Sequence, residues 1–283
     1  MNKLPLETRI QILHMLCEGS AMRAISRITG VSINTVTKLL VDAGAACAEA
    51  HDRLVRNVKA QRIQCDEIWA FCYSKQKNVA TAKAAPAGSG DIWTWTALET
   101  TSKLMISYVS GSRDAGYAMA LMDDLRTRLA TRVQLTTDGH KAYLGAVEEA
   151  FGDDIDYAML VKLYGAAPEG PEVRYSPAQC LGARKTKITG NPDRKHVSTS
   201  YVERSNLTMR MGMRRFTRLT NAHSKKLENH HFAQALYFMY YNFVRMNQAV
   251  RMSPAMAAGI ETRLWEMADL VKLTDDYLAR GSN

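Results

Sequence analysis

The sequence predicts an α/β protein in which a mixed sheet with flanking helices follows a small all-α unit. Three observations support this fold class. Apolar residues recur at helical spacing through the first forty-odd residues, three strand-like segments follow between 62 and 109, and helix and strand patterns alternate over 114–161. A chain of 283 residues buries enough surface to fold around such a core without disulfides.

Residues 1–45 are predicted to form three short helices, because apolar side chains recur every three or four positions and glycines interrupt them. Glycine ends a helix readily, since it adopts the left-handed conformation without strain. The three predicted ends lie at Gly19, Gly30 and Gly44. Residues 46–60 follow as a linking helix of mixed charge.

The second and third of these helices, within residues 25–40, fit a helix-turn-helix. Val36 falls where the second helix of such a pair packs inward. The side chains left facing outward are short and polar, and they suit base edges and phosphates: Asn34, Thr35, Thr37 and Lys38. The pattern predicts a DNA-binding domain over residues 1–45, with an ordinary helical hairpin as the alternative.

The middle of the chain predicts one sheet. Three segments rich in aromatic and β-branched residues predict an antiparallel meander over 62–73, 92–98 and 104–109. After the meander come, in order, a helix over 114–130, a strand over 133–137, a helix over 140–151 and a strand over 157–161. This is the element order of a ribonuclease H-like core, in which the fourth strand lies beside the first.

The rest of the chain, residues 165–283, is predicted to complete this core. Residues 165–198 contain four prolines and are predicted to be irregular. Two helices, over 199–215 and 224–248, then close the core, and a helical tail covers 251–283. The predicted catalytic domain therefore covers 61–250, with its basic insertion around 165–198.

Positive charge is concentrated in one stretch. The chain has 37 Lys and Arg against 28 Asp and Glu, a net charge of +9, and residues 184–226 hold twelve of the basic side chains with only two acids. This concentration of positive charge predicts that the segment binds a polyanion such as DNA. The alternative is a solvated basic face that binds nothing specific. The predicted DNA contacts are Arg204, Arg210, Arg214, Arg215 and Arg218.

Composition excludes several classes of protein. No run of about 18 apolar residues would span a membrane, and the N-terminus lacks the apolar region of a secretion signal. The five cysteines contain no C-x-x-C pair, which excludes a zinc finger and argues against a disulfide framework. We therefore expect a cytoplasmic protein with reduced thiols.

Three carboxylates fall where metal-dependent phosphodiester chemistry would need them. Asp66 lies mid-way along the first strand, Asp138 ends the fourth strand, and Glu203 lies on the helix after the basic insertion. Such chemistry uses two divalent ions, and hard oxygen ligands suit Mg²⁺ or Mn²⁺. Crowded carboxylates repel one another unless cations neutralise them, so the three predict a two-ion catalytic site. Each acid alone has a structural alternative, a turn for Asp138 and an ion pair for Glu203.

The segments around these acids resemble the three catalytic blocks of DDE transposases, most of all those of the insertion-sequence-one family: CDEIWAF at 65–71, TTDGHKAY at 136–143 and YVERSNLTMR at 201–210. The resemblance covers most of residues 20–260. It implies Asp66, Asp138 and Glu203 as metal ligands. It also implies cleavage and strand transfer of double-stranded DNA, at element ends and target, by a homodimer or higher oligomer. The zinc-finger cysteines that precede the helix-turn-helix in some relatives are missing here.

Two alternatives from other classes stay open. A non-catalytic helix-turn-helix protein, such as a repressor or a domesticated transposase, would use the same acids for its structure, and a ribonuclease H-like nuclease would cut branched DNA. Three aromatic residues near the acids receive structural interpretations. His140 is interpreted as a first-turn helix residue at the edge of the sheet, and Trp93 and Trp95 as core residues.

Overall fold

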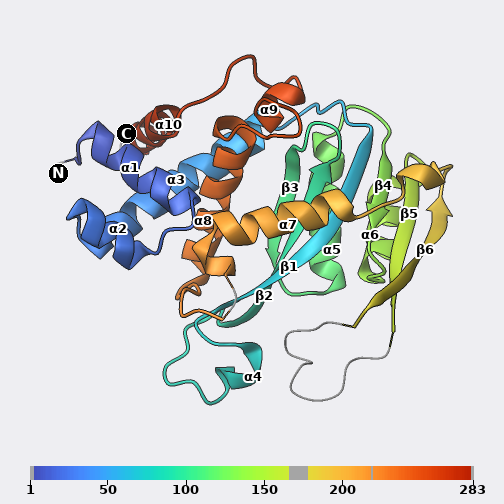
Figure 1. Cartoon of the computed structure of the whole chain (residues 1–283), viewed down its shortest axis with the longest axis horizontal. Coiled ribbons are helices and arrows are strands. Elements are labelled where there is room, and N and C mark those ends of the chain that lie inside the picture. Colours follow the sequence, from blue (N-terminus) through green and yellow to red (C-terminus); the bar gives the residue numbers. More distant parts are fainter. Residues whose placement is uncertain (1–2, 166–177, 218, 282–283) are drawn as a thin grey trace.

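The computed structural model describes residues 3–165, 178–217 and 219–281. Figure 1 shows a twisted sheet with helices on both faces and a further group of helices packed against one end. Among the described residues, no helix combines the length and the apolar character that a membrane crossing requires.

The chain begins with three helices: α1 (Leu6–Cys17), α2 (Met22–Thr29) and α3 (Ile33–Leu54). Gly30 ends α2 with a φ of 69°, in the left-handed region, as its position in the sequence predicts. Ser32 caps α3, because its hydroxyl accepts the backbone N–H of Thr35 at 3.2 Å. A DNA-binding role for the α2–α3 pair stays a prediction.

The prediction that Gly44 ends the third helix is wrong, because α3 continues to Leu54 and includes most of the predicted linking helix. Gly44 lies instead where α3 crosses α8 (Leu227–Met239). A Cβ at Gly44 would lie 2.4 Å from the Cβ of Phe232. The glycine therefore serves a close helix–helix approach and not a turn.

Six strands form one mixed sheet: β1 (Arg62–Cys72), β2 (Gly90–Glu99), β3 (Met105–Gly111), β4 (Gln134–Thr137), β5 (Asp156–Tyr164) and β6 (Cys180–Thr189). Their spatial order is β3-β2-β1-β4-β5-β6. The first three strands form the predicted antiparallel meander, and β4 pairs in parallel with β1 and β5. The predicted neighbourhood of the first and fourth strands is thereby confirmed.

Residues 165–198 are not irregular throughout, because β6 pairs antiparallel with β5 inside this range. Nearly every side chain of β6 is exposed, so the segment lacks the apolar alternation that marks a half-buried strand. Its Lys and Arg side chains suit an edge strand, which must resist pairing with other chains. Residues 166–177 lie outside the described part of the chain.

Helices cover both faces of the sheet. In Figure 1, α7 (Ser200–Gly212) crosses the front face over β1, and α5 (Ala115–Arg128) and α6 (Ala142–Phe151) lie behind it. The helix α8 leads into a π-helical turn (Tyr240–Val244). The other helical segments are α4 (Gln76–Val79), η2 (Arg194–His196), η3 (Arg214–Phe216), α9 (Pro254–Ala257) and α10 (Met267–Arg280).

One apolar core runs through the helical group and the sheet. It extends from Ile12 of α1 through Trp95 of β2 to Val271 of α10, and all three side chains are almost fully buried. The predicted domain boundaries at residues 45, 60 and 250 stay a prediction. Where β4 ends beside the middle of β1, the core gives way to a group of acidic side chains between α7 and the helices behind the sheet.

Candidate metal centre

The parallel pairing of β1 and β4 brings Asp66 and Asp138 together. Cys65 of β1 pairs with Thr137 of β4, so the next residue on each strand is one of the two acids. Gly139 turns the chain away at once, and the backbone N–H of His140 donates to Oδ1 of Asp138 at 2.9 Å. The two carboxylates that the sequence predicts as metal ligands from the sheet are therefore neighbours.

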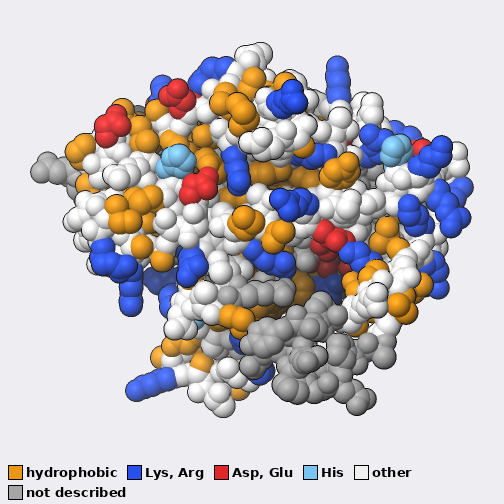
Figure 2. Space-filling model, in the orientation of Figure 1, with side chains coloured by type: hydrophobic (Ala, Val, Ile, Leu, Met, Phe, Trp, Pro, Cys, Tyr) orange, Lys and Arg blue, Asp and Glu red, His pale blue; other side chains and the backbone are white. Residues whose placement is uncertain are grey.

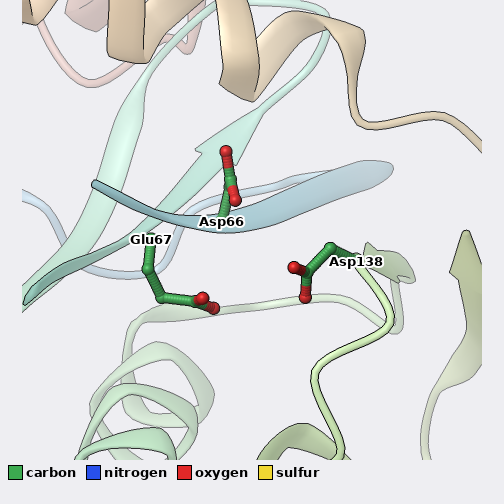
Figure 3. A group of neighbouring side chains, drawn as sticks. All are labelled: Asp66, Glu67 and Asp138. Atoms are coloured by element: carbon green, nitrogen blue, oxygen red, sulfur yellow. The ribbon is translucent and has the colours of Figure 1, made fainter. Parts of the chain in front are cut away.

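Glu67 is a third member of this group, which sequence reasoning missed. Asp66, Glu67 and Asp138 each offer a carboxylate oxygen, and these oxygens lie within 4.8 Å of one another. Figure 3 shows that Asp66 and Glu67 leave β1 on opposite sides, while the carboxyl group of Asp138 lies beside that of Glu67. We call these three residues the carboxylate group.

A basic side chain lies against one side of the carboxylate group. Arg113, in the turn after β3, donates from Nε to Oε2 of Glu67 at 3.0 Å, and its Nη2 lies 3.8 Å from Oδ2 of Asp138. The guanidinium also lies over the ring of Trp93, 4.6 Å from its centre. Because the side chain of Glu67 is only 1% exposed, Arg113 supplies the counter-charge that such burial requires.

Glu203 lies in the first turn of α7 and has partners of its own. Lys162 of β5 donates to both of its carboxylate oxygens at 2.6 Å, and the hydroxyl of Thr199 donates to Oε1 at 2.6 Å. Glu203 is near enough to raise the pKa of Asp66 through its charge, although it is not one of the three oxygens grouped above. Its role as a third metal ligand stays a prediction.

Two buried amides hold α7 against β1. The side-chain oxygen of Gln64 accepts the backbone N–H groups of Tyr201 and Val202 at 2.9 and 3.1 Å, which satisfies donors at the start of α7. One turn after Glu203, Nδ2 of Asn206 donates to Oδ2 of Asp66 at 2.8 Å. These contacts fix the distance between α7 and β1 and the rotation of α7 about its own axis.

Burial and mutual repulsion raise the pKa values of two acids in the carboxylate group, Asp66 and Glu67. Burial raises the pKa of Asp66 to about 7, and the charges of Glu67 and Asp138 act in the same direction. Burial likewise raises the pKa of Glu67, with the charge of Asp138 adding to it. A cation beside these oxygens would relieve the repulsion and favour the ionised forms of both acids.

The donor set fits a divalent cation such as Mg²⁺ or Mn²⁺. All the nearby ligand atoms are hard carboxylate oxygens, which these ions prefer. In the described structure, the side-chain oxygen Oδ1 of Asn206 is buried without a hydrogen-bond partner, so one further polar atom beside the site is unsatisfied. The fold and this site together define an α/β protein with a group of three neighbouring carboxylates where β4 ends beside the middle of β1.

The predicted DNA contacts of α3 lie near its start. Asn34 and Lys38 are exposed, while Thr35 and Thr37 are half-buried, with hydroxyls that bond to Ser32 and to the carbonyl of Ile33. Lys38 also forms an ion pair with Asp42 at 2.6 Å. Their contact with DNA stays a prediction.

The predicted contacts in the basic segment divide by environment. Arg204 is exposed on α7, and Arg210 and Arg214 are half-buried. Arg215 uses its guanidinium for bonds inside the protein, and Arg218 lies outside the described residues. Figure 2 shows basic side chains on either side of a small acidic patch below α7 and a second basic group over β6.

The aromatic residues near the acids have different environments. Trp95 is fully buried, as expected for a core residue, and its ring meets that of His140 edge-on at 5.6 Å. Trp93 is only partly buried beneath Arg113, so the prediction of a core position is incomplete for it. Nδ1 of His140 accepts the N–H of Ala142 at 3.1 Å, which agrees with a structural role at the start of α6.

Known proteins resemble the chain in structure and not in sequence. No protein-family model and no curated protein sequence matches the chain. Among solved structures, the chain is similar to the Mos1 transposase paired-end complex with left transposon end (14% identity, 56% of this chain and 60% of that chain, TM-score 0.24). It is also similar to the Mos1 strand transfer complex (15% identity, 56% and 59%, TM-score 0.24).

A third similar structure is the synaptic complex of piggyBac transposase with hairpin DNA (11% identity, 80% of this chain and 54% of that chain, TM-score 0.29). The chain thus spans little more than half the length of these proteins. TM-scores of this size do not assign a family.

Proposed function

We propose that the chain is a DNA transposase of the DDE type, with a ribonuclease H-like catalytic core. The observation that supports it most is the closeness of Asp66, in the middle of β1, and Asp138, directly after the parallel strand β4, beneath a helix that carries Glu203. The three sequence blocks around these acids point to the insertion-sequence-one family as the particular family. The substrate would be double-stranded DNA at the ends of the element and at its target.

Asp66, Asp138 and Glu203 would hold two Mg²⁺ or Mn²⁺ ions, with Glu67 as a further oxygen donor. Such ions stabilise the negative charge that develops on the attacking and leaving oxygens of a phosphodiester. The contribution of the chain itself is orientation. Asn206 fixes one oxygen of Asp66, and Thr199 and Lys162 hold the carboxylate of Glu203 over β5.

The helical pair α2–α3 and the basic segment 184–226 would bind the DNA. Asn34 at the start of α3 would read base edges, and exposed arginines such as Arg204 would contact phosphates. A homodimer or higher oligomer would hold two element ends together, and the protein would act in the cytoplasm on the nucleoid.

Carboxamide variants test this function. Asp66→Asn and Asp138→Asn keep the shape of each side chain and remove a charge that the ions need. With DNA that carries the flanking ends of the gene, either variant should lose cleavage in Mg²⁺ or Mn²⁺ and keep its affinity for DNA in EDTA. A wild-type protein that never cuts such DNA would contradict the proposal.

A non-catalytic DNA-binding protein is the second candidate, and two ion pairs favour it. Lys162 pairs with Glu203 and Arg113 with Glu67, so part of the acidic charge is balanced without any metal. If Glu67 and Glu203 serve only the fold, Glu67→Gln or Glu203→Gln breaks one of these pairs and lowers the melting temperature. Asp66→Asn breaks neither pair and removes a repulsion, so the transposase proposal expects it to hold or raise the melting temperature without metal.

A further inference from the structure

A cavity of about 760 Å³ lies apart from the carboxylate group, between the N-terminal helices and the segment that follows α7. One wall comes from α1, α2 and α3, and the other from residues 213–215 and 221–225 and from α8. Figure 1 shows these elements side by side at the helical end of the molecule. A volume of this size is typical of sites for small molecules and cofactors.

The charge of the cavity lining has one sign. Arg23, Arg214, Arg215 and Lys225 line it, and no Asp or Glu does so among the described residues. Within the described part of the chain, none of these four side chains forms an ion pair with a carboxylate. Four unbalanced positive charges around one hollow create a potential that attracts anions.

Arg215 shows the imbalance most clearly. Its Nη1 donates to Oγ of Ser224 at 3.2 Å and to the carbonyl of Asn229 at 3.0 Å, and its Nη2 lies 3.8 Å from the sulfur of Met22. All three partners are neutral. Burial lowers the pKa of Arg215 to about 10, so the guanidinium is still charged at neutral pH. A buried charge without a counter-charge is costly, and an anion in the cavity would supply one.

The other lining residues suit the remainder of a nucleotide. Apolar side chains such as Leu16, Met22 and Ile33 offer a surface for a base, and the small polar side chains of Ser20, Thr37 and Asn221 offer hydrogen bonds to a sugar. Apolar surface with a few polar groups and a concentrated positive charge is the chemistry that binds phosphorylated nucleosides.

We propose that this cavity binds one nucleotide, with its phosphate on Arg215 and the neighbouring basic side chains and its base against the apolar wall. The nucleotide is either free in solution or one unit of a DNA strand. The proposal does not depend on the transposase function, since none of Asp66, Glu67 or Asp138 lines the cavity. An occupant would bridge the N-terminal helices and α8, and so stabilise their packing.

Calorimetric titration with ATP and with a short single-stranded oligothymidylate tests the proposal on the full-length chain. The double variant Arg23→Gln with Lys225→Gln removes two charges from the cavity and should weaken binding at least tenfold, since charge-assisted bonds to phosphate are strong. The matched variant Arg27→Gln with Arg53→Gln removes two exposed charges that do not line the cavity, and its affinity should stay within about twofold of wild type.

A second variant keeps the charges and fills the space. Ala222→Phe places a ring in the cavity and should also abolish binding, while circular dichroism shows that the fold is intact. If ATP binds more tightly than the oligonucleotide, the occupant of the cavity is a free nucleotide. If the oligonucleotide binds more tightly, the occupant is one unit of a DNA strand. Equal weakening by the two double variants, or equal affinity for ATP and polyglutamate, would overturn the nucleotide site. Loss of DNA cleavage in Asp66→Asn with unchanged ATP binding would separate this proposal from the transposase function.

Discussion

Asn206 donates a hydrogen bond of 2.8 Å from Nδ2 to Oδ2 of Asp66, and this bond ties α7 to β1 at the candidate metal centre. Asn206 lies one turn after Glu203 on the same face of α7. This face therefore carries Glu203 and also, through Asn206, holds the carboxylate of Asp66 in place. The arrangement makes Asn206 a positioning residue, which would act on a metal through the carboxylate that it orients.

We expect Asn206→Ala to weaken Mn²⁺ binding by about 10–100-fold, because residues that orient a ligand contribute this much to metal affinity. The measurement is a calorimetric titration of the full chain with Mn²⁺. Thr208→Ala, on the same helix, removes only a hydroxyl that bonds to the carbonyl of Arg204 and should leave the affinity unchanged. Equal affinities for the wild type and both variants would show that Asn206 serves packing alone.

The raised pKa of Asp66 predicts how stability depends on pH in the absence of metal. The folded state binds the proton of Asp66 more tightly than the unfolded state, whose pKa is about 3.9. The stabilisation is therefore complete below about pH 4 and is lost as the pH rises to about 7. The lost free energy is at most about 4 kcal/mol, since each pKa unit is worth about 1.4 kcal/mol.

The test compares urea unfolding in EDTA over this range of pH. Asp66→Asn should flatten the profile and exceed the stability of the wild type at pH 8. Asp123→Asn, at an exposed position of α5, is the matched control and should keep the profile of the wild type. A variant at position 66 that is less stable than wild type at every pH would mean that the carboxylate stabilises the fold.

Strands with an apolar face could be predicted from the sequence, including the edge strand β3, and the exposed edge strand β6 could not. The segments of β1 to β5 alternate or carry continuous apolar residues, because at least one face of each meets the core. In β6 both faces are exposed, and pairing with β5 alone makes it a strand. Gly44 misled for a related reason, since its close approach to Phe232 depends on a helix far away in the sequence.

Part of the candidate site was also predictable. The closeness of Asp66 and Asp138 follows from the order of the first and fourth strands, which the sequence indicates. Glu67 was missed because neighbouring side chains of a strand point to opposite faces, which argues against adjacent acids sharing a site. Here the longer side chain of Glu67 lies beside Asp138, which follows the end of β4. The contacts of Lys162 and Asn206 depend on tertiary packing and leave no local signal.

The exposed arginines predict a salt dependence for DNA binding. Arg184 on β6 and Arg204 on α7 are both exposed and form no ion pair in the described structure. The slope of log K against log salt concentration is negative. For each phosphate that the protein no longer neutralises, the magnitude of this slope should fall by about 0.9. Changing both residues to Gln should thus lower the magnitude of the slope by about 1.8. Fluorescence anisotropy with random duplex DNA measures it.

The matched control is Arg53→Gln with Arg251→Gln, which removes the same charge from exposed positions outside the basic segment. This control should keep the slope of the wild type. If both double variants lower the slope equally, net charge and not local contact governs the affinity.

Asn34 is the residue through which α3 would discriminate among sequences. It is exposed in the first turn, and no side-chain hydrogen bond holds it in the described structure. Asn34→Ala should lower the ratio of affinities for end DNA and random DNA by the equivalent of about 1–3 kcal/mol, the usual cost of removing one good bond to a base. Lys38→Ala should weaken both DNAs alike, because phosphate contacts carry no sequence information. An unchanged ratio in Asn34→Ala would exclude this residue as the reader.

Two helical glycines predict opposite effects of the same substitution on stability. A Cβ at Gly44 of α3 would meet the Cβ, Cα and carbonyl oxygen of Phe232 at 2.4–2.7 Å, so the two helices would have to separate. Gly44→Ala should therefore lower the free energy of unfolding by about 1–3 kcal/mol or more. A Cβ at Gly145 of α6 would meet nothing within 4 Å, and Gly145→Ala should raise stability by about 0.5–1 kcal/mol through helix propensity. Chemical unfolding measures the free energy of unfolding of both variants. A stabilising effect of Gly44→Ala would refute the close crossing of α3 and α8.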